Sequence, residues 1–396
     1  MQHLKQTIQT LAKDYRAETI QIRRHLHAHP ELSFEEFATS DYIASQLKAL
    51  GIPYTQGIVK TGIVALIEGK NPAKKTVALR GDMDALPITE ANNVDYKSRN
   101  NGVMHACGHD VHTASLLGTA KILNELKNHF EGTIKLIFQP GEEKLPGGAS
   151  LMIKEGVLEN PKTDSIFAQH VFPSMEVGKV GFRNGMYMAS TDEIYVTVTG
   201  KGGHAAMPAD YTNPLLIASQ ILLELNKIFM QEVQEAPTVL AFGKITGTGA
   251  TNVIPDEVKI EGTFRTMNEL WRAKAHAKMK KIAEDIAKNM GGSCDFRIEH
   301  GYPFLVNDEI VTSHARDAAE NYLGKENVEE LPMRMTAEDF AFFSQQVPAC
   351  FYRLGTGNKA KGITSGVHTA TFDIDEQALE ISIGLMAWLA LNELNS

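Results

Sequence analysis

The feature that most constrains the fold of this chain is an alternation of short apolar strands and helical segments along its first 170 residues. Four apolar segments are strand candidates: Ile63–Ile67, Thr76–Arg80, Thr133–Phe138 and Ser165–Gln169. Helical patterns separate the later strands, one from about residue 112 to 124 and one opened by Gly147-Gly148. This alternation predicts an α/β fold, in which a mostly parallel sheet is covered by helices on both faces.

Acidic residues and a histidine follow three of these strands. Asp82 and Asp84 come after the second strand, Glu142 and Glu143 after the third, and His170 after the fourth. In such sheets, ligands bind just beyond the carboxyl ends of the strands. The sequence therefore predicts that these side chains meet in one site at that edge of the sheet.

The segment Val103–His112 lies between the two acidic pairs and carries Cys107 and His109, two positions apart. A near-extended backbone there would point both side chains towards one ion, and Gly108 lets the chain bend between them. Asp110 can accept the second ring proton of a ligating histidine and so fix its tautomer. The alternative is a loop that leads into a helix, with Cys107 as a small buried apolar residue.

The pair Glu142-Glu143 favours a division of labour. Adjacent carboxylates are usually solvated charges, but these follow a strand, a Pro-Gly turn and the Cys/His segment. One would ligate a metal while the other takes a proton from a bound water. His170 and His368 are the remaining ligand candidates, although a lone histidine is more often structural. A competing chemistry uses Cys107 as a nucleophile activated by a histidine, and it leaves Glu143 and both histidines without a role.

The pattern changes near Met188. The segment Asp192–Gly200 alternates with period two, as a half-exposed strand does, and Gly202–His204 reads as a turn. Further strands and two helices follow, up to a last strand at Cys294–His300. We therefore expect a smaller α+β domain at residues 190–299, inserted into a discontinuous catalytic domain at 1–189 and 300–396.

Helices are expected at both ends of the larger domain. One runs from about Leu4 to His29 and stops at Pro30, and Ser33 reads as the N-cap of a second. Another helix is expected to start near Glu338. The apolar run Ile381–Leu391 is too short to span a bilayer and reads as a buried C-terminal helix.

The composition argues against several classes of partner. The net charge is −9 and there is no Lys/Arg block, which argues against nucleic acid and against an anionic membrane. The N-terminus shows no apolar signal segment. The three cysteines, Cys107, Cys294 and Cys350, are sparse and odd in number, which predicts a reducing compartment, taken here as the cytoplasm, and no disulfide framework.

Five motifs stand in an order that resembles a known family. They are Arg80–Pro87, His105–Asp110, Gln139–Glu143, Gly203–Pro208 and Ala337–Phe340. The chain resembles the dinuclear-metal amidohydrolases that include hippurate hydrolase, N-acetyldiaminopimelate deacetylase and the plant auxin-conjugate (IAA-amino acid) hydrolases. These are relatives of aminoacylase and of the dinuclear-zinc carboxypeptidases. The resemblance runs from about residue 25 to residue 379.

The resemblance implies two divalent metal ions per subunit. Their implied ligands are Cys107, His109, Glu143, His170 and His368. It implies Glu142 as general base and then general acid. It also implies that Asp84 orients one of the ligands. Thiolate favours zinc or another soft ion, whereas carboxylate and imidazole also accept manganese, so Mn²⁺ and Zn²⁺ both fit, with nickel and cobalt as further options.

The resemblance also assigns roles to the smaller domain. It implies that this domain is a lid that forms a homodimer. His204 would reach an active site, its own or the partner subunit's, and stabilise the oxyanion. Asn252 and Arg265 would hold the substrate carboxylate, although an arginine at the end of a strand is more often an ion-pair residue.

The function predicted from the sequence is metal-dependent hydrolysis of the amide bond of N-acyl amino acids, such as N-acetyl or N-benzoyl derivatives. One alternative is a metallo-exopeptidase that acts on dipeptides. Another is a non-catalytic protein that binds a metal or ligand and kept the fold. The intact Glu142-Glu143 pair argues against this second alternative, and so do the five candidate ligand positions.

Overall fold

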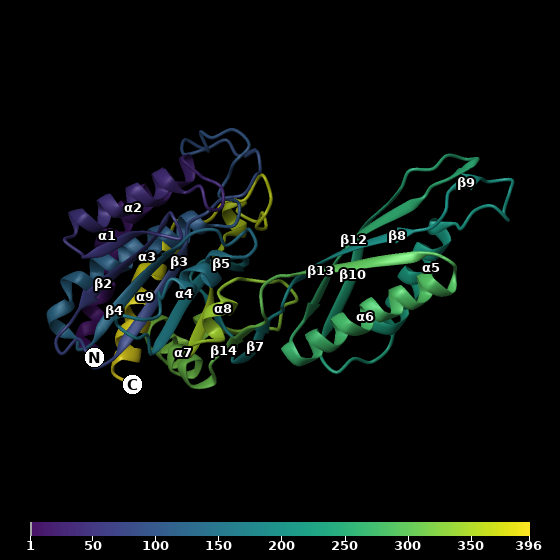
Figure 1. Cartoon of the computed structure of the whole chain (residues 1–396). Helices are drawn as coiled ribbons and strands as arrows, with labels where there is room; N and C mark the ends of the chain where they lie inside the picture. Colours follow the sequence, from purple (N-terminus) through teal and green to yellow (C-terminus); the bar gives the residue numbers. More distant parts are fainter. Residues whose placement is uncertain (1) are drawn as a thin grey trace. The chain divides into compact units, whose positions relative to one another are not determined.

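The computed structural model describes residues 2–396 and divides the chain into two compact units. Unit 1 comprises the chain up to Tyr187 together with Val306–Pro332 and Asp339–Ser396. Unit 2 comprises Met188–Leu305 and Met333–Glu338. The larger unit is therefore interrupted in sequence by the smaller one, as the colours of Figure 1 show.

An eight-stranded sheet forms the centre of unit 1. Its strands, in order across the sheet, are β1 (Tyr54–Ile58), β2 (Gly62–Glu68), β4 (Thr133–Gln139), β3 (Thr76–Asp82), β5 (Ser165–Glu176), β16 (Ala349–Gly357), β6 (Val180–Phe182) and β15 (Val328–Glu330). The neighbours β4–β3, β3–β5, β5–β16 and β6–β15 run parallel. The neighbours β1–β2, β2–β4 and β16–β6 run antiparallel. The predicted α/β class is confirmed, with a mixed sheet whose centre is parallel.

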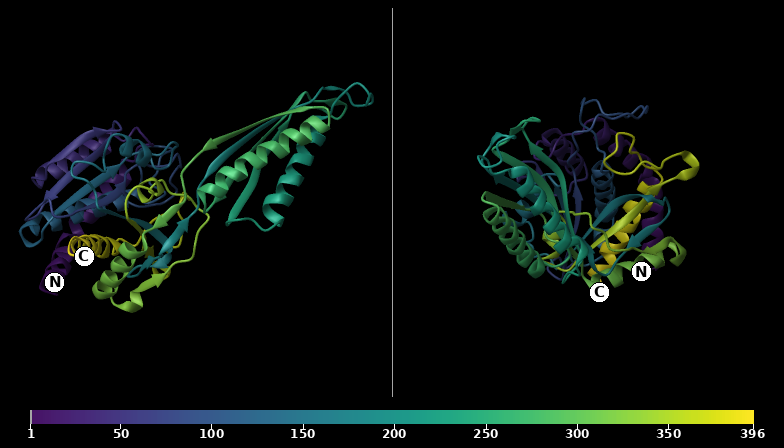
Figure 2. Two further views of the ribbon diagram at one scale, coloured as in Figure 1. Left: turned by 60° about the horizontal axis from the view of Figure 1, so that its bottom comes forward. Right: turned by 90° about the vertical axis from the view of Figure 1, so that its right-hand side faces the viewer.

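Helices cover this sheet. They are α1 (Gln2–Ala28), α2 (Phe37–Ala49), α3 (His109–Glu125), α4 (Gly148–Lys154), α7 (Glu309–Leu323), α8 (Ala341–Ser344) and α9 (Ala378–Leu394). Every residue of β3, β4 and β16 is buried, so both faces of the sheet are covered at its centre. Helices α1, α3 and α9 contact one another, and α3 and α9 also contact β3 (Figure 2).

Helix α9 is almost entirely buried. Its apolar residues are distributed around the helix, because it contacts three helices, α1, α3 and α7, as well as strands β3 and β16. The prediction of a buried C-terminal helix is confirmed, and the helix is longer at both ends than the apolar run. Within residues 2–396, no helix combines the length and apolar character that crossing a membrane requires.

Unit 2 is an antiparallel sheet with two helices. The strands, in order, are β10 (Thr238–Gly247), β12 (Glu257–Thr266), β8 (Asp192–Thr199) and β13 (Ser293–His300). Helices α5 (Pro214–Asn226) and α6 (Glu269–Asn289) contact each other and lie on one face of this sheet (Figure 1). In β8, buried residues alternate with more exposed ones, because only the helix-facing side chains enter the core.

The remaining short elements connect these layers. Strands β9 (Gly203–His204) and β11 (Val253–Ile254) form a two-stranded ribbon, and β7 (Gly185–Met188) pairs with β14 (Leu305–Asn307). A π-helical turn follows α5 at Lys227–Gln231, and 3-10 turns lie at Lys127–His129, Lys325–Asn327 and Lys359–Lys361.

Several local predictions were wrong. Ser33 does not cap a helix: its hydroxyl donates to Asp84, and α2 begins only at Phe37. By contrast, the helix expected to start near Glu338 is present as α8, which begins after a turn, at Ala341. His204 lies in a strand because its backbone pairs with Val253. Strand β5 continues beyond the apolar run, so that His170 lies within the strand rather than after it.

Candidate metal centre

Five of the predicted site residues meet at one end of the central strands of unit 1. Cys107 and His109 lie at the start of α3, Glu143 follows β4, His170 lies in β5, and His368 lies in the loop between β16 and α9. Their candidate ligand atoms fall into groups within 4.8 Å of one another: Cys107 with His109 and His170, and Cys107 with Glu143 and His368. Cys107 belongs to both groups, so its thiol stands between two sets of donors.

The distances within these groups are short. Sγ of Cys107 lies 3.4 Å from Nε2 of His170 and 3.3 Å from Nε2 of His368. Nε2 of His368 lies 3.2 Å from Oε1 of Glu143, and Nε2 of His109 lies 3.9 Å from the same oxygen. Strand pairing brings these donors together, since β3, β4, β5 and β16 end at the same edge of the sheet.

The backbone between Cys107 and His109 is not near-extended as the spacing suggested. Gly108 has a φ of +82° and is the N-cap of α3, so His109 is the first residue of that helix. A Cβ atom at Gly108 would lie 2.6 Å from a methyl carbon of Val171. The left-handed glycine, which no larger side chain could replace here, turns both neighbouring side chains into the same site.

Asp84, and not Asp110, orients the histidine of this segment. Oδ1 of Asp84 lies 3.1 Å from Nδ1 of His109, which directs Nε2 of the ring into the site. Asp110 instead accepts from the Arg23 guanidinium at 2.7 Å and pairs with Nδ1 of His27 at 2.8 Å. As the second residue of α3, Asp110 points back towards α1 rather than towards the site.

The second histidine is oriented by the backbone. Nδ1 of His170 donates to the carbonyl oxygen of Val171 at 2.8 Å, so its Nε2 carries a lone pair that faces Cys107. The amide of Val171 in turn donates to Nε2 of His112 at 2.9 Å, and Nδ1 of His112 pairs with Asp82. Both ring nitrogens of His112 are therefore engaged in hydrogen bonds, so His112 positions the Val171 backbone and is not available as a metal ligand.

A buried charge network that the sequence analysis missed lies beneath the site. Arg80 donates to Gln139 at 2.8 Å and to Asp339 at 2.9 Å, and it pairs with Asp82. Although burial opposes ionisation, Arg80 holds the pKa of Asp82 well below its usual range. The available signal was the position of Arg80 directly after the apolar run Val77–Leu79 of a buried strand, where a charge requires buried partners.

Glu142 lies beside the donor groups and is almost fully buried. Its Oε2 is 4.0 Å from Nε2 of His109, and its Oε1 accepts from the backbone amide of Asp339 at 3.4 Å. Asp339 is itself held by Gln139 and by the amide of Ala149 at the start of α4. The two adjacent glutamates thus have different surroundings: Glu143 faces Cys107 and His368, whereas Glu142 is held by the Asp339 segment.

The electrostatics of the donor groups fit a divalent cation. Burial, Glu143 and Glu142 raise the pKa of the Cys107 thiol well above its usual value, so the thiolate needs a nearby cation. Nε2 of His109 and Oε1 of Glu143 are buried, and within residues 2–396 neither makes a well-aligned hydrogen bond, although Oε1 lies 3.2 Å from Nε2 of His368. Buried polar atoms are normally satisfied, and a metal ion would use both of these. The sulfur, nitrogen and oxygen donors suit a borderline-soft ion.

The other three predicted site residues lie in unit 2. His204 is exposed on β9, and its Nδ1 accepts from the amide of Ala206 at 3.1 Å. The neighbouring Ala205 amide donates to the carbonyl of Asn252 at 3.0 Å, which brings His204 and Asn252 to one ribbon. Arg265 lies on β12, half-buried, and donates to the carbonyl of Met335 at 3.2 Å.

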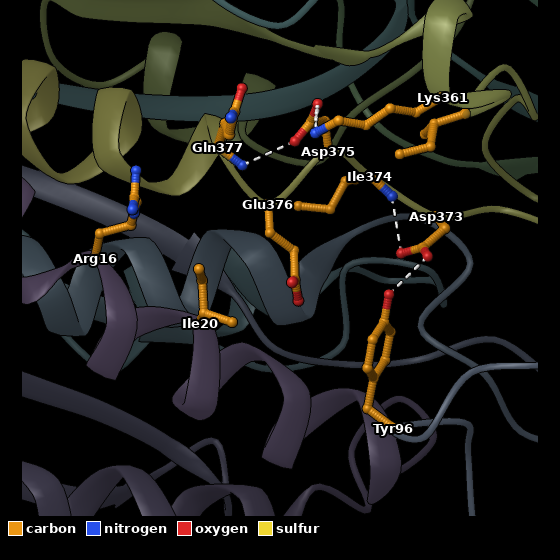
Figure 3. Close-up of a pocket in the computed structure, with 10 residues that line it drawn as sticks. Arg16, Ile20, Tyr96, Lys361, Asp373, Ile374, Asp375, Glu376 and Gln377 are labelled. Atoms are coloured by element: carbon orange, nitrogen blue, oxygen red, sulfur yellow. Dashed lines mark hydrogen bonds and ion pairs between the residues drawn. The ribbon is translucent and has the colours of Figure 1, made fainter.

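A separate cavity of about 380 Å³ lies against the segment that follows His368 (Figure 3). Its wall contains Asp373, which accepts from the hydroxyl of Tyr96 at 2.8 Å and from Arg23 at 2.9 Å. Lys361 in the same wall pairs with Asp375. None of the metal-centre residues lines this cavity, and its carboxylates are already paired: Asp375 with Lys361, Asp373 with Arg23 and Glu376 with Arg24. The ion pairs in its wall attach the segment after His368 to α1.

Comparison with known proteins gives a consistent result. The model of peptidase family M20/M25/M40 matches residues 78–392. An N-acyl-L-amino acid amidohydrolase of Geobacillus stearothermophilus is 40% identical over 76% of this chain and 81% of its own, and thermostable carboxypeptidase 2 of Saccharolobus solfataricus is 38% identical over 94% of each. The crystal structure of a dinuclear metal binding peptidase from Bacillus subtilis, of the M20 family, superposes with a TM-score of 0.84 at 33% identity, over 97% of this chain and 99% of its own.

Proposed function

Since this chain belongs to peptidase family M20/M25/M40, we propose that it is a metal-dependent amidohydrolase that cleaves N-acyl amino acids to a free amino acid and a carboxylate. The observation that carries the proposal is the placement of two adjacent glutamates. Glu143 stands among the Cys107 and histidine donors, while Glu142 lies beside them, held from the Asp339 backbone. Hydrolysis of an amide needs this pair of functions, a metal ligand and a proton carrier.

The donors fit two divalent ions. Cys107, His109, Glu143, His170 and His368 would hold them, and Asp84 would keep His109 in the ligating tautomer. The dinuclear metal centre named for the related B. subtilis peptidase supports this stoichiometry. Zn²⁺ and Mn²⁺ are the ions we propose, because the set combines a thiolate with imidazoles and a carboxylate, and nickel and cobalt remain options for the same donors.

The ions, when bound, would lower the pKa of a water molecule and polarise the acyl carbonyl. Glu142 takes the proton of the attacking water through its carboxylate and later delivers that proton to the departing amine. Its burial supports this role, because a carboxylate that is shielded from bulk water keeps the proton for the leaving group. The buried Asp339 amide fixes the position of one carboxylate oxygen and leaves the other directed towards the donor groups.

The residues of unit 2 have the chemistry needed for substrate binding. We assign His204 as the donor to the oxyanion that develops on the acyl oxygen, and Asn252 and Arg265 as the groups that bind the substrate carboxylate. His204 and Asn252 share one ribbon, so they would move together on a lid. Arg265 keeps further guanidinium N–H groups beyond the one that Met335 accepts.

A homodimer formed through unit 2 completes the proposal. Helix α5 exposes Leu216 and Leu223, seven residues apart on one face, and an apolar face of this kind favours burial against another copy. Size-exclusion chromatography with light scattering should give about twice the mass of the chain. We propose the cytoplasm as the location, because all three cysteines are unpaired, as in a reducing compartment.

A second candidate function is cleavage of dipeptides as a metallo-exopeptidase. The carboxypeptidase named above, 38% identical to this chain, favours that reading. Both reactions use the same metal centre, so the difference lies in the acyl group that the site accepts. The amidohydrolase relative supports the first candidate, and a substrate panel separates the two.

The test is release of free amine from N-acetyl, N-benzoyl and N-succinyl amino acids, with dipeptides as the comparison. The protein is stripped with chelator and assayed with and without Mn²⁺ or Zn²⁺. Activity on acyl amino acids that returns with metal supports the proposal. Cleavage of dipeptides alone would move the assignment to the exopeptidase. Activity that survives chelation would point to Cys107 as a nucleophile and remove the metal from the reaction.

A further inference from the structure

Two left-handed residues lie against each other next to the metal centre. Phe34 has a φ of 67°, which is rare for a bulky side chain, and Gly141 has a φ of 61°. The ring of Phe34 covers Gly141 so closely that a Cβ atom there would lie 2.4 Å from two ring carbons. A strained residue of this kind persists only where its surroundings hold it in place, and such sites cluster near functional groups.

One buried carboxylate oxygen holds both of these residues. Oε1 of Glu36 accepts from the backbone amide of Phe34 at 2.8 Å and from the backbone amide of Gly141 at 2.8 Å. Its other oxygen, Oε2, accepts from the hydroxyl of Thr61 at 2.8 Å. The Glu36 side chain is fully buried, so water does not compete for these bonds.

Gly141 is the residue immediately before Glu142. The turn that carries the two glutamates is therefore tied to Glu36 at its start. Its far end is tied through Asp84, whose Oδ2 accepts from the amide of Glu143 at 3.0 Å and from the hydroxyl of Ser33 at 2.6 Å. The short segment of residues 33–36 thus holds both ends of the turn.

We propose that Glu36 is a positioning residue for Glu142: by binding the amides of Phe34 and Gly141 with one oxygen, it fixes the turn from which the base projects. The inference rests on the function proposed above. Glu36 touches neither the substrate nor the donor groups, so its effect passes through the backbone of Gly141. A base must be held within about half an ångström of its working position, and a shift of about 1 Å can cost about a hundredfold in rate.

The hydrogen bonds of Glu36 require an acceptor oxygen at this position but do not require a negative charge. Two amides donate to Oε1, and a glutamine can provide the same acceptor oxygen. The amide nitrogen of that glutamine would face Thr61, whose hydroxyl can accept as well as donate. Burial, with a smaller contribution from Asp84, raises the pKa of Glu36 to about 7, which also indicates that a neutral side chain is tolerated there. Glu36→Gln should therefore rescue the function that Glu36→Ala loses.

The experiment compares Glu36→Ala, Glu36→Gln and the exposed neighbour control Glu35→Ala, each loaded with metal. For Glu36→Ala we expect kcat per metal-loaded molecule to fall by at least tenfold, with KM changed less than threefold. Glu36→Gln and Glu35→Ala should keep kcat within threefold of the wild type. Hydrogen–deuterium exchange of the metal-free proteins should be faster at residues 139–143 in Glu36→Ala only.

Other outcomes overturn the proposal. If folded Glu36→Ala keeps the wild-type kcat, or if exchange at residues 139–143 is unchanged, Glu36 does not position the turn. If Glu36→Gln loses as much activity as Glu36→Ala, the acceptor argument is wrong. Where Glu36→Ala does not fold, Glu36→Asp, whose carboxylate is one methylene shorter, must show the lowered kcat. An inactive wild type would refute the proposed function, whereas the exchange comparison would still test Glu36.

Discussion

The Oδ1 atom of Asp84 lies 3.1 Å from Nδ1 of His109, while Oδ2 of the same carboxylate accepts from the Glu143 amide and the Ser33 hydroxyl. One side chain therefore fixes the ring of one candidate ligand and the backbone of another. An asparagine in its place would direct an NH₂ group, which cannot accept, either at the His109 ring or at the Glu143 amide and Ser33 hydroxyl. We expect Asp84→Asn to weaken metal binding about 10- to 100-fold, the usual cost of losing such an orienting group.

Competition with a metal-binding dye measures this effect. Asp95→Asn is the control, because Asp95 is exposed and should leave the metal affinity unchanged. If Asp84→Asn binds metal as tightly as the wild type does, His109 is either not oriented by Asp84 or not a ligand.

Glu142 should be needed for turnover and not for metal binding. Glu142→Gln removes the proton carrier and keeps the shape of the side chain. We expect kcat to fall about 10²- to 10⁴-fold, the range for loss of a general acid–base group, with metal content unchanged. Metal analysis and steady-state kinetics on the same sample test both parts. The exposed Glu159→Gln is the control, and a Glu142→Gln enzyme with normal turnover would remove Glu142 from the mechanism.

Cys107 should be needed for metal retention. Its Sγ lies within 3.4 Å of ring nitrogens from two different segments, so loss of the thiol removes a donor shared by both groups. We expect Cys107→Ala to retain less metal than the wild type after dialysis against a weak chelator, as measured by mass spectrometry of the bound metal. Cys294→Ala, which removes a half-buried thiol in unit 2, should retain the wild-type amount. Equal retention in both variants would mean that Cys107 is not a ligand.

Much of the fold followed from periodicity, because period-two and period-3.6 patterns report which faces of an element are buried. The three strands that carry or precede Asp82, Glu143 and His170 begin at the expected residues, although β5 continues past the expected end to Glu176. What periodicity cannot supply is the partner of a polar side chain. Asp110 stands next to His109 in sequence, yet it turns towards Arg23, whereas Asp84, 25 residues away, bonds the ring.

The turn at residues 33–36 shows the same limit. Its sequence has the pattern of a helix N-terminus, with a serine followed by acidic residues, and was interpreted in that way. In the structure the Ser33 hydroxyl and the Glu36 carboxylate bind groups from distant segments, Asp84 and the Gly141 amide. A local rule fails here because tertiary partners compete successfully for the same polar atoms.

Arg23 should be a major determinant of stability. It is fully buried and pairs with Asp110 at 2.7 Å and with Asp373 at 2.9 Å, joining the start of α3 to the segment that follows His368. Arg23→Met would leave the Asp110 carboxylate buried with less compensation. We expect a loss of about 3–5 kcal/mol in the free energy of unfolding, measured by urea denaturation of the metal-free protein.

The neighbouring arginine is a matched control. Like Arg23, Arg24 forms an ion pair with a carboxylate, in this case Glu376 at 2.6 Å, but the Arg24 side chain is 38% exposed. Ion pairs in contact with water contribute little, so Arg24→Met should cost about 1 kcal/mol or less. Similar losses for the two variants would mean that burial of Arg23 does not set its contribution.

Stability should depend on pH through Glu36. In the folded chain the pKa of this carboxyl is raised from 4.5 to about 7, first by burial and then by the nearby Asp84. Between these two values the folded state holds a proton that the unfolded chain has released, so the free energy of unfolding falls as pH rises through this window. A shift of this size corresponds to about 3 kcal/mol.

Glu36→Gln removes this titration and keeps the acceptor oxygen for the Phe34 and Gly141 amides. The stability of the variant relative to the wild type should therefore increase by about 3 kcal/mol between pH 4.5 and pH 7.5, measured by urea denaturation of the metal-free proteins at each pH. Glu35→Gln, at the exposed neighbour, should show no such trend. A difference between Glu36→Gln and the wild type that stays constant with pH would mean that Glu36 is already ionised in the folded protein near pH 5, because the amides and the Thr61 hydroxyl then compensate its burial.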